Sequence, residues 1–101
     1  MEKQDIINRI SILRTRANLS ARALSINIGM NEWYISRLES KKQGFLPSVD
    51  VLLKIIKECG STPEEFFYYD VNQYKKDEEI IKLLSTANDE KKQAIISLLK
   101  N

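Results

Sequence analysis

Hydrophobic positions along the chain recur at intervals of three and four residues, which is the spacing of one face of an α-helix. The first series consists of Ile6, Ile10, Leu13 and Ala17. A later series consists of Leu52, Ile55, Ile56 and Cys59. Alternation of apolar and polar residues is confined to short stretches, so the pattern predicts an all-α fold without a sheet.

Two short helices joined by a tight turn are predicted between these series. Ser20 is a good N-cap for the first helix, and Gly29 is expected to end it because glycine adopts positive φ at no steric cost. Asn31 is expected to cap the second helix, which turns Ile35 and Leu38 inward. The pattern therefore predicts a helix-turn-helix.

Further helices are predicted toward the C-terminus. Ser48 is expected to cap a helix that Gly60 closes. The run Thr62-Pro63-Glu64-Glu65 has the form of a capping box with proline at the first helical position, and it opens a short fifth helix. After an irregular stretch, apolar spacing predicts helices over residues 77–86 and 90–100.

Composition limits the chemistry that the chain offers. Histidine is absent, which removes the commonest general base and the commonest metal ligand, and no glycine-rich phosphate loop occurs. The single Cys59 excludes an internal disulfide and fits a reducing compartment. We expect no secretory signal, because the first residues form no apolar stretch, and the sequence has no run of the roughly 20 apolar residues that a membrane helix needs. We expect a cytoplasmic protein that is not an enzyme, with no metal, no cofactor and no membrane partner.

Charge is distributed unevenly although the whole chain carries only +2. Residues 1–60 contain ten basic and six acidic residues, a net charge of +4, whereas residues 61–101 contain six and eight, a net charge of −2. The first half is therefore where a polyanion is expected to bind.

The second helix of the tight-turn pair has polar and aromatic side chains on its outward face. They are Asn31, Glu32, Trp33, Ser36 and Arg37. An exposed helix held by a tight turn is suited to DNA, because the major groove admits an α-helix and displays a distinct donor and acceptor pattern for each base pair.

The order and spacing of these pieces closely resemble the phage-repressor/Cro-like helix-turn-helix family, often called XRE, over about residues 5–69. The segments that carry the resemblance are Leu19-Ser20, Leu24-Ser25, Ile28-Gly29-Met30-Asn31, Tyr34-Ile35-Ser36-Arg37-Leu38-Glu39, Pro47-Ser48, Leu52-Leu53, Ile56 and Thr62-Pro63-Glu64-Glu65-Phe66-Phe67. The resemblance implies a five-helix, repressor-like DNA-binding domain over residues 1–70. Residues 71–101 then form a two-helix C-terminal extension.

The resemblance also implies roles for single residues. Arg14 and Glu39 are expected to form a structural ion pair between the first helix and the end of the recognition helix. The residues expected to contact bases are Glu32, Trp33 and Arg37. Those expected to contact phosphates are Ser20, Arg22, Asn31, Lys41 and Lys42. Ala21 stands where many relatives have a DNA-contacting glutamine, so that contact is either missing or made by Arg22.

The C-terminal extension has more apolar surface than two short helices hide from each other. It therefore either folds back on the first domain or buries a partner. Because repressor-like proteins usually bind DNA as dimers, we predict a homodimer formed mainly through residues 76–101. The residues expected at its interface are Ile80, Leu84, Ile95, Leu98 and Leu99.

These observations predict a sequence-specific regulator of transcription that binds double-stranded DNA. We expect a repressor that occupies a palindromic operator as a homodimer. The alternative is a protein-interaction module, such as an antitoxin or a modulator, whose DNA binding is weak or secondary. Ala21 and Glu32 support this alternative, because neither residue is a typical DNA contact.

Overall fold

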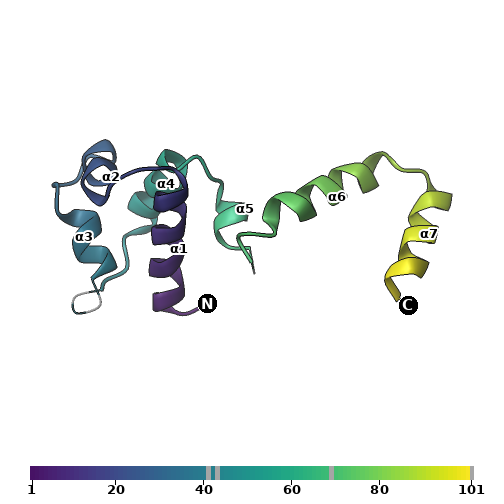
Figure 1. Cartoon of the computed structure of the whole chain (residues 1–101), viewed down its shortest axis with the longest axis horizontal. Coiled ribbons are helices and arrows are strands. Elements are labelled where there is room, and N and C mark those ends of the chain that lie inside the picture. The colour runs from purple at the N-terminus through teal and green to yellow at the C-terminus, as the bar shows by residue number, and fades with distance from the viewer. Residues whose placement is uncertain (41, 43, 69, 101) are drawn as a thin grey trace. The chain divides into compact units, whose positions relative to one another are not determined.

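A computed structural model describes residues 1–40, 42, 44–68 and 70–100 of the chain. Its helices, labelled in Figure 1, are α1 (Lys3–Arg16), α2 (Ala21–Asn27), α3 (Tyr34–Glu39), α4 (Val49–Glu58), α5 (Pro63–Phe66), α6 (Tyr74–Thr86) and α7 (Asp89–Lys100). No strand occurs among the described residues, which confirms the predicted all-α fold. The chain divides into two compact units, residues 1–68 and residues 69–101.

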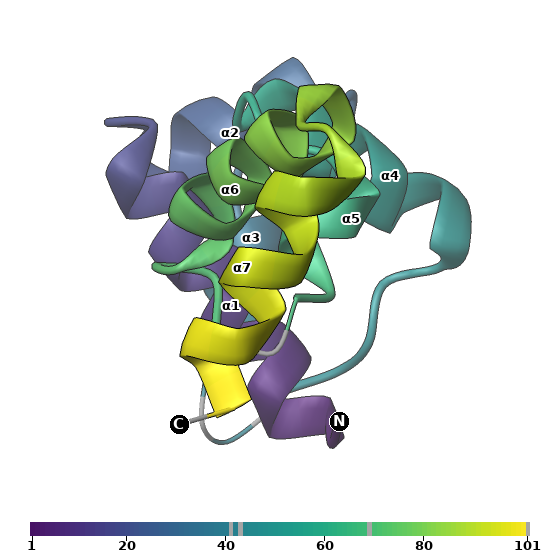
Figure 2. The ribbon, with the colours of Figure 1, turned by 90° about the vertical axis from the view of Figure 1, so that its right-hand side faces the viewer.

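In the first unit, α2 packs against α3 and α4, α1 packs against the same two helices, and α5 packs against α4. Figure 2 draws the same helices turned by 90° from the view of Figure 1. The apolar side chains buried between them are Ile7, Ile10, Leu13, Leu24, Ile28, Ile35, Leu38, Ile55, Ile56 and Phe66. Burying a side chain of this size stabilises the fold by about 1.5–3 kcal/mol. This core fixes the orientation of α3, whose Ile35 and Leu38 are both fully buried.

Three helices begin at the predicted caps. The hydroxyl of Ser20 accepts a hydrogen bond from the Ala23 amide at 3.0 Å, and that of Ser48 accepts one from the Val51 amide at 3.3 Å. Thr62 accepts one from the Glu65 amide at 3.2 Å at the start of α5. The polar signals in the sequence therefore placed these helix starts correctly.

The second half of the predicted capping box is not formed as expected. The Glu65 carboxylate, which is buried, accepts a hydrogen bond from the Ser61 hydroxyl, and its Oε2 lies 3.6 Å from Nη1 of Arg16. A neighbouring hydroxyl and a cation are stronger partners for this carboxylate than the Thr62 amide, so it turns toward α1 instead.

Asn31 also acts differently from the prediction. Its side-chain oxygen accepts a hydrogen bond from the Trp33 amide at 2.8 Å, and α3 begins only at Tyr34. A bond to the amide two residues ahead closes an Asx-turn, whereas a helix N-cap bonds two or three residues into the helix. Asn31 therefore stabilises the turn before α3.

Cys59 lies at the C-terminal end of α4 and is partly buried. Burial, with a smaller effect from neighbouring Glu58, raises the pKa of its thiol to about 11. Because the thiolate is the reactive form, this cysteine contributes packing and is a poor nucleophile at neutral pH.

The second unit contains α6 and α7, and neither helix has a buried residue. Helix α6 begins at Tyr74, three residues before the predicted start. Large apolar side chains are exposed along both helices: Ile80, Ile81, Leu83, Ile96, Leu98 and Leu99. Among the described residues, no helix combines the length and the apolar character needed to cross a membrane.

Candidate nucleic-acid interface

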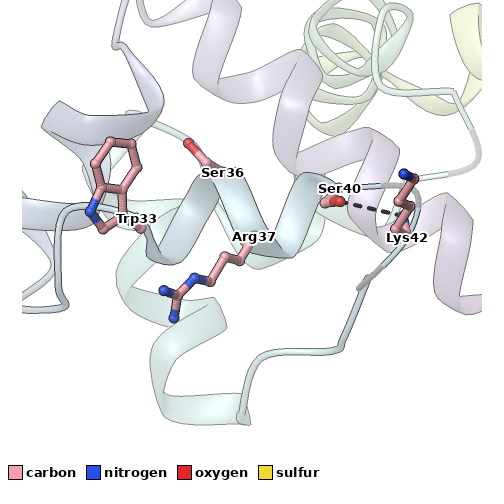
Figure 3. A pocket seen from close by; sticks show the side chains of 5 residues that line it. All are labelled: Trp33, Ser36, Arg37, Ser40 and Lys42. Carbon is pink, nitrogen blue, oxygen red and sulfur yellow. Dashed lines mark hydrogen bonds between the residues drawn. The ribbon is translucent and has the colours of Figure 1, made fainter.

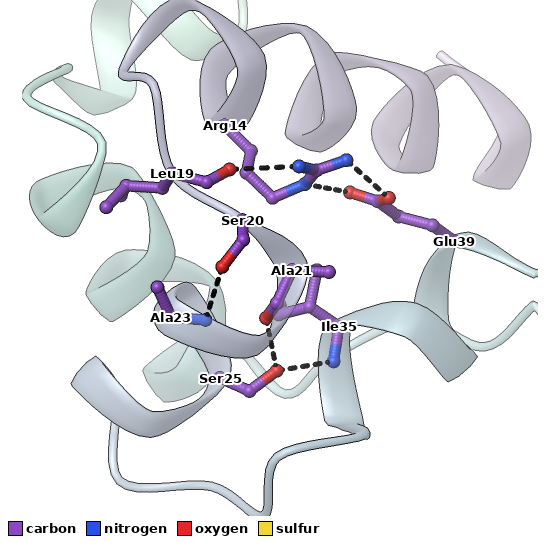
Figure 4. Close-up of polar contacts among 8 residues, drawn as sticks. All are labelled: Arg14, Leu19, Ser20, Ala21, Ala23, Ser25, Ile35 and Glu39. Atoms are coloured by element: carbon purple, nitrogen blue, oxygen red, sulfur yellow. Dashed lines mark hydrogen bonds and ion pairs between the residues drawn. The ribbon is translucent and has the colours of Figure 1, made fainter.

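The angle between α2 and α3 is fixed by a hydroxyl group buried between them. Ser25 is fully buried, and its Oγ donates to the Ala21 carbonyl at 2.7 Å and accepts from the Ile35 amide at 2.9 Å (Figure 4). The Met30 amide bonds the Ser25 carbonyl at 2.9 Å, and Gly29 adopts a φ of +80° in the turn. A small side chain lets the helices approach, and its hydroxyl satisfies a backbone amide at the start of α3.

The far end of α3 is tied to α1 by an ion pair. Arg14 donates from Nε to Oε1 of Glu39 at 2.9 Å and from Nη2 to Oε2 at 3.0 Å (Figure 4). Its Nη1 donates to the Leu19 carbonyl at 2.9 Å. The hydrogen bonds with Glu39 raise the pKa of the Arg14 guanidinium, against the opposing effect of burial. The structure thus brings together the two residues expected to form a structural pair.

Replacing Glu39 with alanine is expected to lower the free energy of unfolding by about 2 kcal/mol, because it leaves a largely buried guanidinium without its carboxylate. In a domain of this size that loss lowers the melting temperature by about 10 °C, which circular dichroism at 222 nm measures. The matched control is Glu78→Ala, which removes an exposed ion pair with Lys82 and is expected to cost less than about 0.5 kcal/mol. Equal melting temperatures for the two variants would contradict a structural role for Glu39.

The outer face of α3 is open. Trp33, Ser36, Arg37 and Ser40 occupy positions i, i+3, i+4 and i+7, and they line a shallow hollow together with Lys42 (Figure 3). The Trp33 residue is 57% exposed, and Ser36 and Arg37 are exposed as well. The guanidinium of Arg37 forms no hydrogen bond or ion pair with any residue that the structure describes. Its donors are therefore available to a ligand that lies along the helix.

Arg22 and Glu32, for which separate DNA contacts are expected, contact each other instead. Nε of Arg22 lies 3.1 Å from Oε2 of Glu32, and their side chains are 72% and 42% exposed. Arg22 lies in the first turn of α2, and Glu32 lies in the turn before α3. The residues are ten positions apart, so the contact depends on the angle between the helices, which sequence spacing did not give.

The remaining residues that are expected to contact phosphates differ in the hydrogen-bond donors that they leave available. Ser20 and Asn31 are exposed, and each uses a side-chain oxygen as an acceptor within the protein. The hydroxyl proton of Ser20 and the amide protons of Asn31 remain able to donate to a phosphate. Lys42 is exposed beside the end of α3, whereas Lys41 lies outside the described residues.

Comparison with known proteins identifies the family of this part of the chain. Residues 10–66, which include α2, the turn and α3, match the family model described as helix-turn-helix. No curated protein and no solved structure matches the chain.

Proposed function

Because the chain belongs to the helix-turn-helix family of DNA-binding transcription regulators, we propose that it recognises a specific operator through α3 and represses transcription by occupying it. The observation that supports this most directly is the outer face of α3. That face exposes an aromatic ring and an unpaired guanidinium on a helix held at its start by Ser25 and at its end by Arg14. A rigid helix with exposed side chains on one face that can contact base edges fits the major groove.

Arg37 and Trp33 are the base-reading residues that we propose. A guanidinium forms two hydrogen bonds with O6 and N7 of guanine, and the indole ring packs on a thymine methyl group or a sugar. Ser20, Asn31, Lys41 and Lys42 would hold the neighbouring phosphates, which sets the register without reading sequence. Glu32 is engaged by Arg22 in the free protein, so we leave it out of the base-reading set.

We propose that the protein acts as a homodimer joined through α6 and α7. Two recognition helices about 34 Å apart would read two half-sites one turn of DNA apart, and the two-fold symmetry of the dimer makes the operator palindromic. The apolar side chains that α6 and α7 expose support this arrangement. Helices of this length are only marginally stable in water unless an apolar face is covered.

The test is selection from a random duplex library followed by titration of the enriched sequence at several salt concentrations. We expect a palindromic sequence with half-sites about 10 base pairs apart. We also expect the logarithm of the association constant to fall linearly with the logarithm of the salt concentration, with a slope of about −0.9 for each phosphate that the protein neutralises. Failure to enrich any sequence, with binding that does not depend on salt, would reject the proposal.

A second candidate function rests on the same exposed surface of α6 and α7. The face around Ile80, Leu83 and Leu84 also suits a different protein, with DNA binding secondary, as in an antitoxin or a modulator. The two candidates differ in oligomeric state. A regulator of the proposed kind is a dimer by itself, whereas an interaction module is a monomer until its partner is added. Light scattering on the purified chain separates them.

A further inference from the structure

We infer that Glu32 acts as an internal substitute for a DNA phosphate, which keeps Arg22 from strengthening binding to DNA of the wrong sequence. The inference rests on the proposed function. It assigns a specificity-determining role to an ion pair on the surface that faces DNA.

The position of the pair supports this role. Arg22 lies in the first turn of α2 and Glu32 precedes α3, so their contact joins the N-terminal ends of the two helices of the motif. In helix-turn-helix proteins the first helix crosses the DNA backbone and the start of the second meets the base edges. Arg22 is therefore where a phosphate is expected, and a carboxylate already occupies it.

The chemistry of the two anions is similar. A guanidinium recognises carboxylates and phosphates through the same planar set of N–H donors. The pair is exposed, and ion pairs of this kind are weak, so a phosphate can displace the carboxylate. Displacement requires a phosphate that is fixed in position beside Arg22, and this register is set only when Trp33 and Arg37 contact their bases.

The expected consequence is electrostatic. While Arg22 and Glu32 are paired, their net charge is zero, so Arg22 neutralises no phosphate and releases no counterion. On random DNA the pair persists, and Arg22 adds nothing to the salt-dependent part of the affinity. On the operator Arg22 contacts a phosphate. The ratio of the two affinities is therefore larger than it would be with a free arginine.

The test compares the parent protein, Glu32→Gln, Arg22→Gln and the double variant on a random 25-base-pair duplex. Glu32→Gln is expected to bind about fivefold more tightly at about 0.15 M salt and to steepen the salt dependence by about one counterion. Adding Arg22→Gln to it should cancel the steepening. The matched control Glu79→Gln removes the same charge from exposed α6 and is expected to change neither quantity.

Two results would overturn the inference while leaving the proposed function standing. One is an unchanged salt slope in Glu32→Gln. The other is loss of preference at a single base position in that variant, which would show that Glu32 reads a base. Absence of any salt-dependent binding by the parent protein would reject the proposed function and the inference together.

The ion pair is also tested without DNA. The Nε–Hε signal of Arg22 in a ¹⁵N NMR spectrum of the free protein is expected to shift in Glu32→Gln and to stay in place in Glu79→Gln. An unmoved signal in Glu32→Gln would show that the contact does not exist in solution, and the inference would fail whatever the DNA affinities are.

Discussion

Replacing Leu98 and Leu99 together with lysine is expected to convert the protein from a dimer to a monomer and to weaken operator binding about a hundredfold or more. Both side chains are almost fully exposed, at 75% and 80%, so the change removes no packing within the protomer. Lysine near a helix C-terminus is favourable, which protects α7 itself. Joining two binding modules raises overall affinity by about 10²–10⁴, and a monomer loses that gain.

The control for this variant lies on the same helix. Gln93→Lys with Ser97→Lys adds the same two charges on the opposite side of α7, at positions that are also exposed. Light scattering gives the oligomeric state, and fluorescence anisotropy on the selected operator gives the affinity. The added lysines attract DNA in both variants, so a loss confined to the leucine variant reports the interface. A leucine variant that remains dimeric would exclude this face of α7.

Local signals in the sequence were sufficient for most of the fold. Hydroxyl caps and glycines at positive φ depend on the residue itself and its immediate neighbours. The caps placed the helix starts after Ser20, Ser48 and Thr62, and the glycines placed the turns at Gly29 and Gly60. Periodicity was less exact at the chain start. The predicted series included Ile6, but Ile7 is the buried residue, because either position continues a face through Ile10 and the choice depends on what packs against it.

Contacts between elements were harder to predict. Ser25 was expected only as a small residue at a close approach, and its two hydrogen bonds depend on where the Ile35 amide lies. The contact between Arg22 and Glu32 likewise requires the angle between α2 and α3. Two opposite charges ten residues apart in the sequence do not show whether their side chains point toward each other. The pair of Arg14 and Glu39 could be predicted because the resemblance to repressor-like proteins implies how the first helix and the recognition helix are arranged in space.

Replacing Arg37 with alanine is expected to relax base preference at one position of each half-site. The affinity for the preferred base should fall by about tenfold to a hundredfold per half-site, since a bidentate contact with guanine provides about 1–3 kcal/mol of discrimination. Arg37 is exposed and unpaired among the described residues, so the free energy of unfolding is expected to change by less than about 0.5 kcal/mol. Selection from a random library and a melting curve measure the two effects.

Two further substitutions separate the charge of Arg37 from its shape. Arg37→Lys keeps the positive charge and loses the planar pair of donors, so it is expected to lose base preference while keeping the parental salt slope. Lys42→Ala is expected to do the opposite, weakening all sequences about equally and making the slope shallower by about one. If Arg37→Lys instead kept the parental base preference, Arg37 would act through its charge alone, and sequence would have to be read elsewhere on α3.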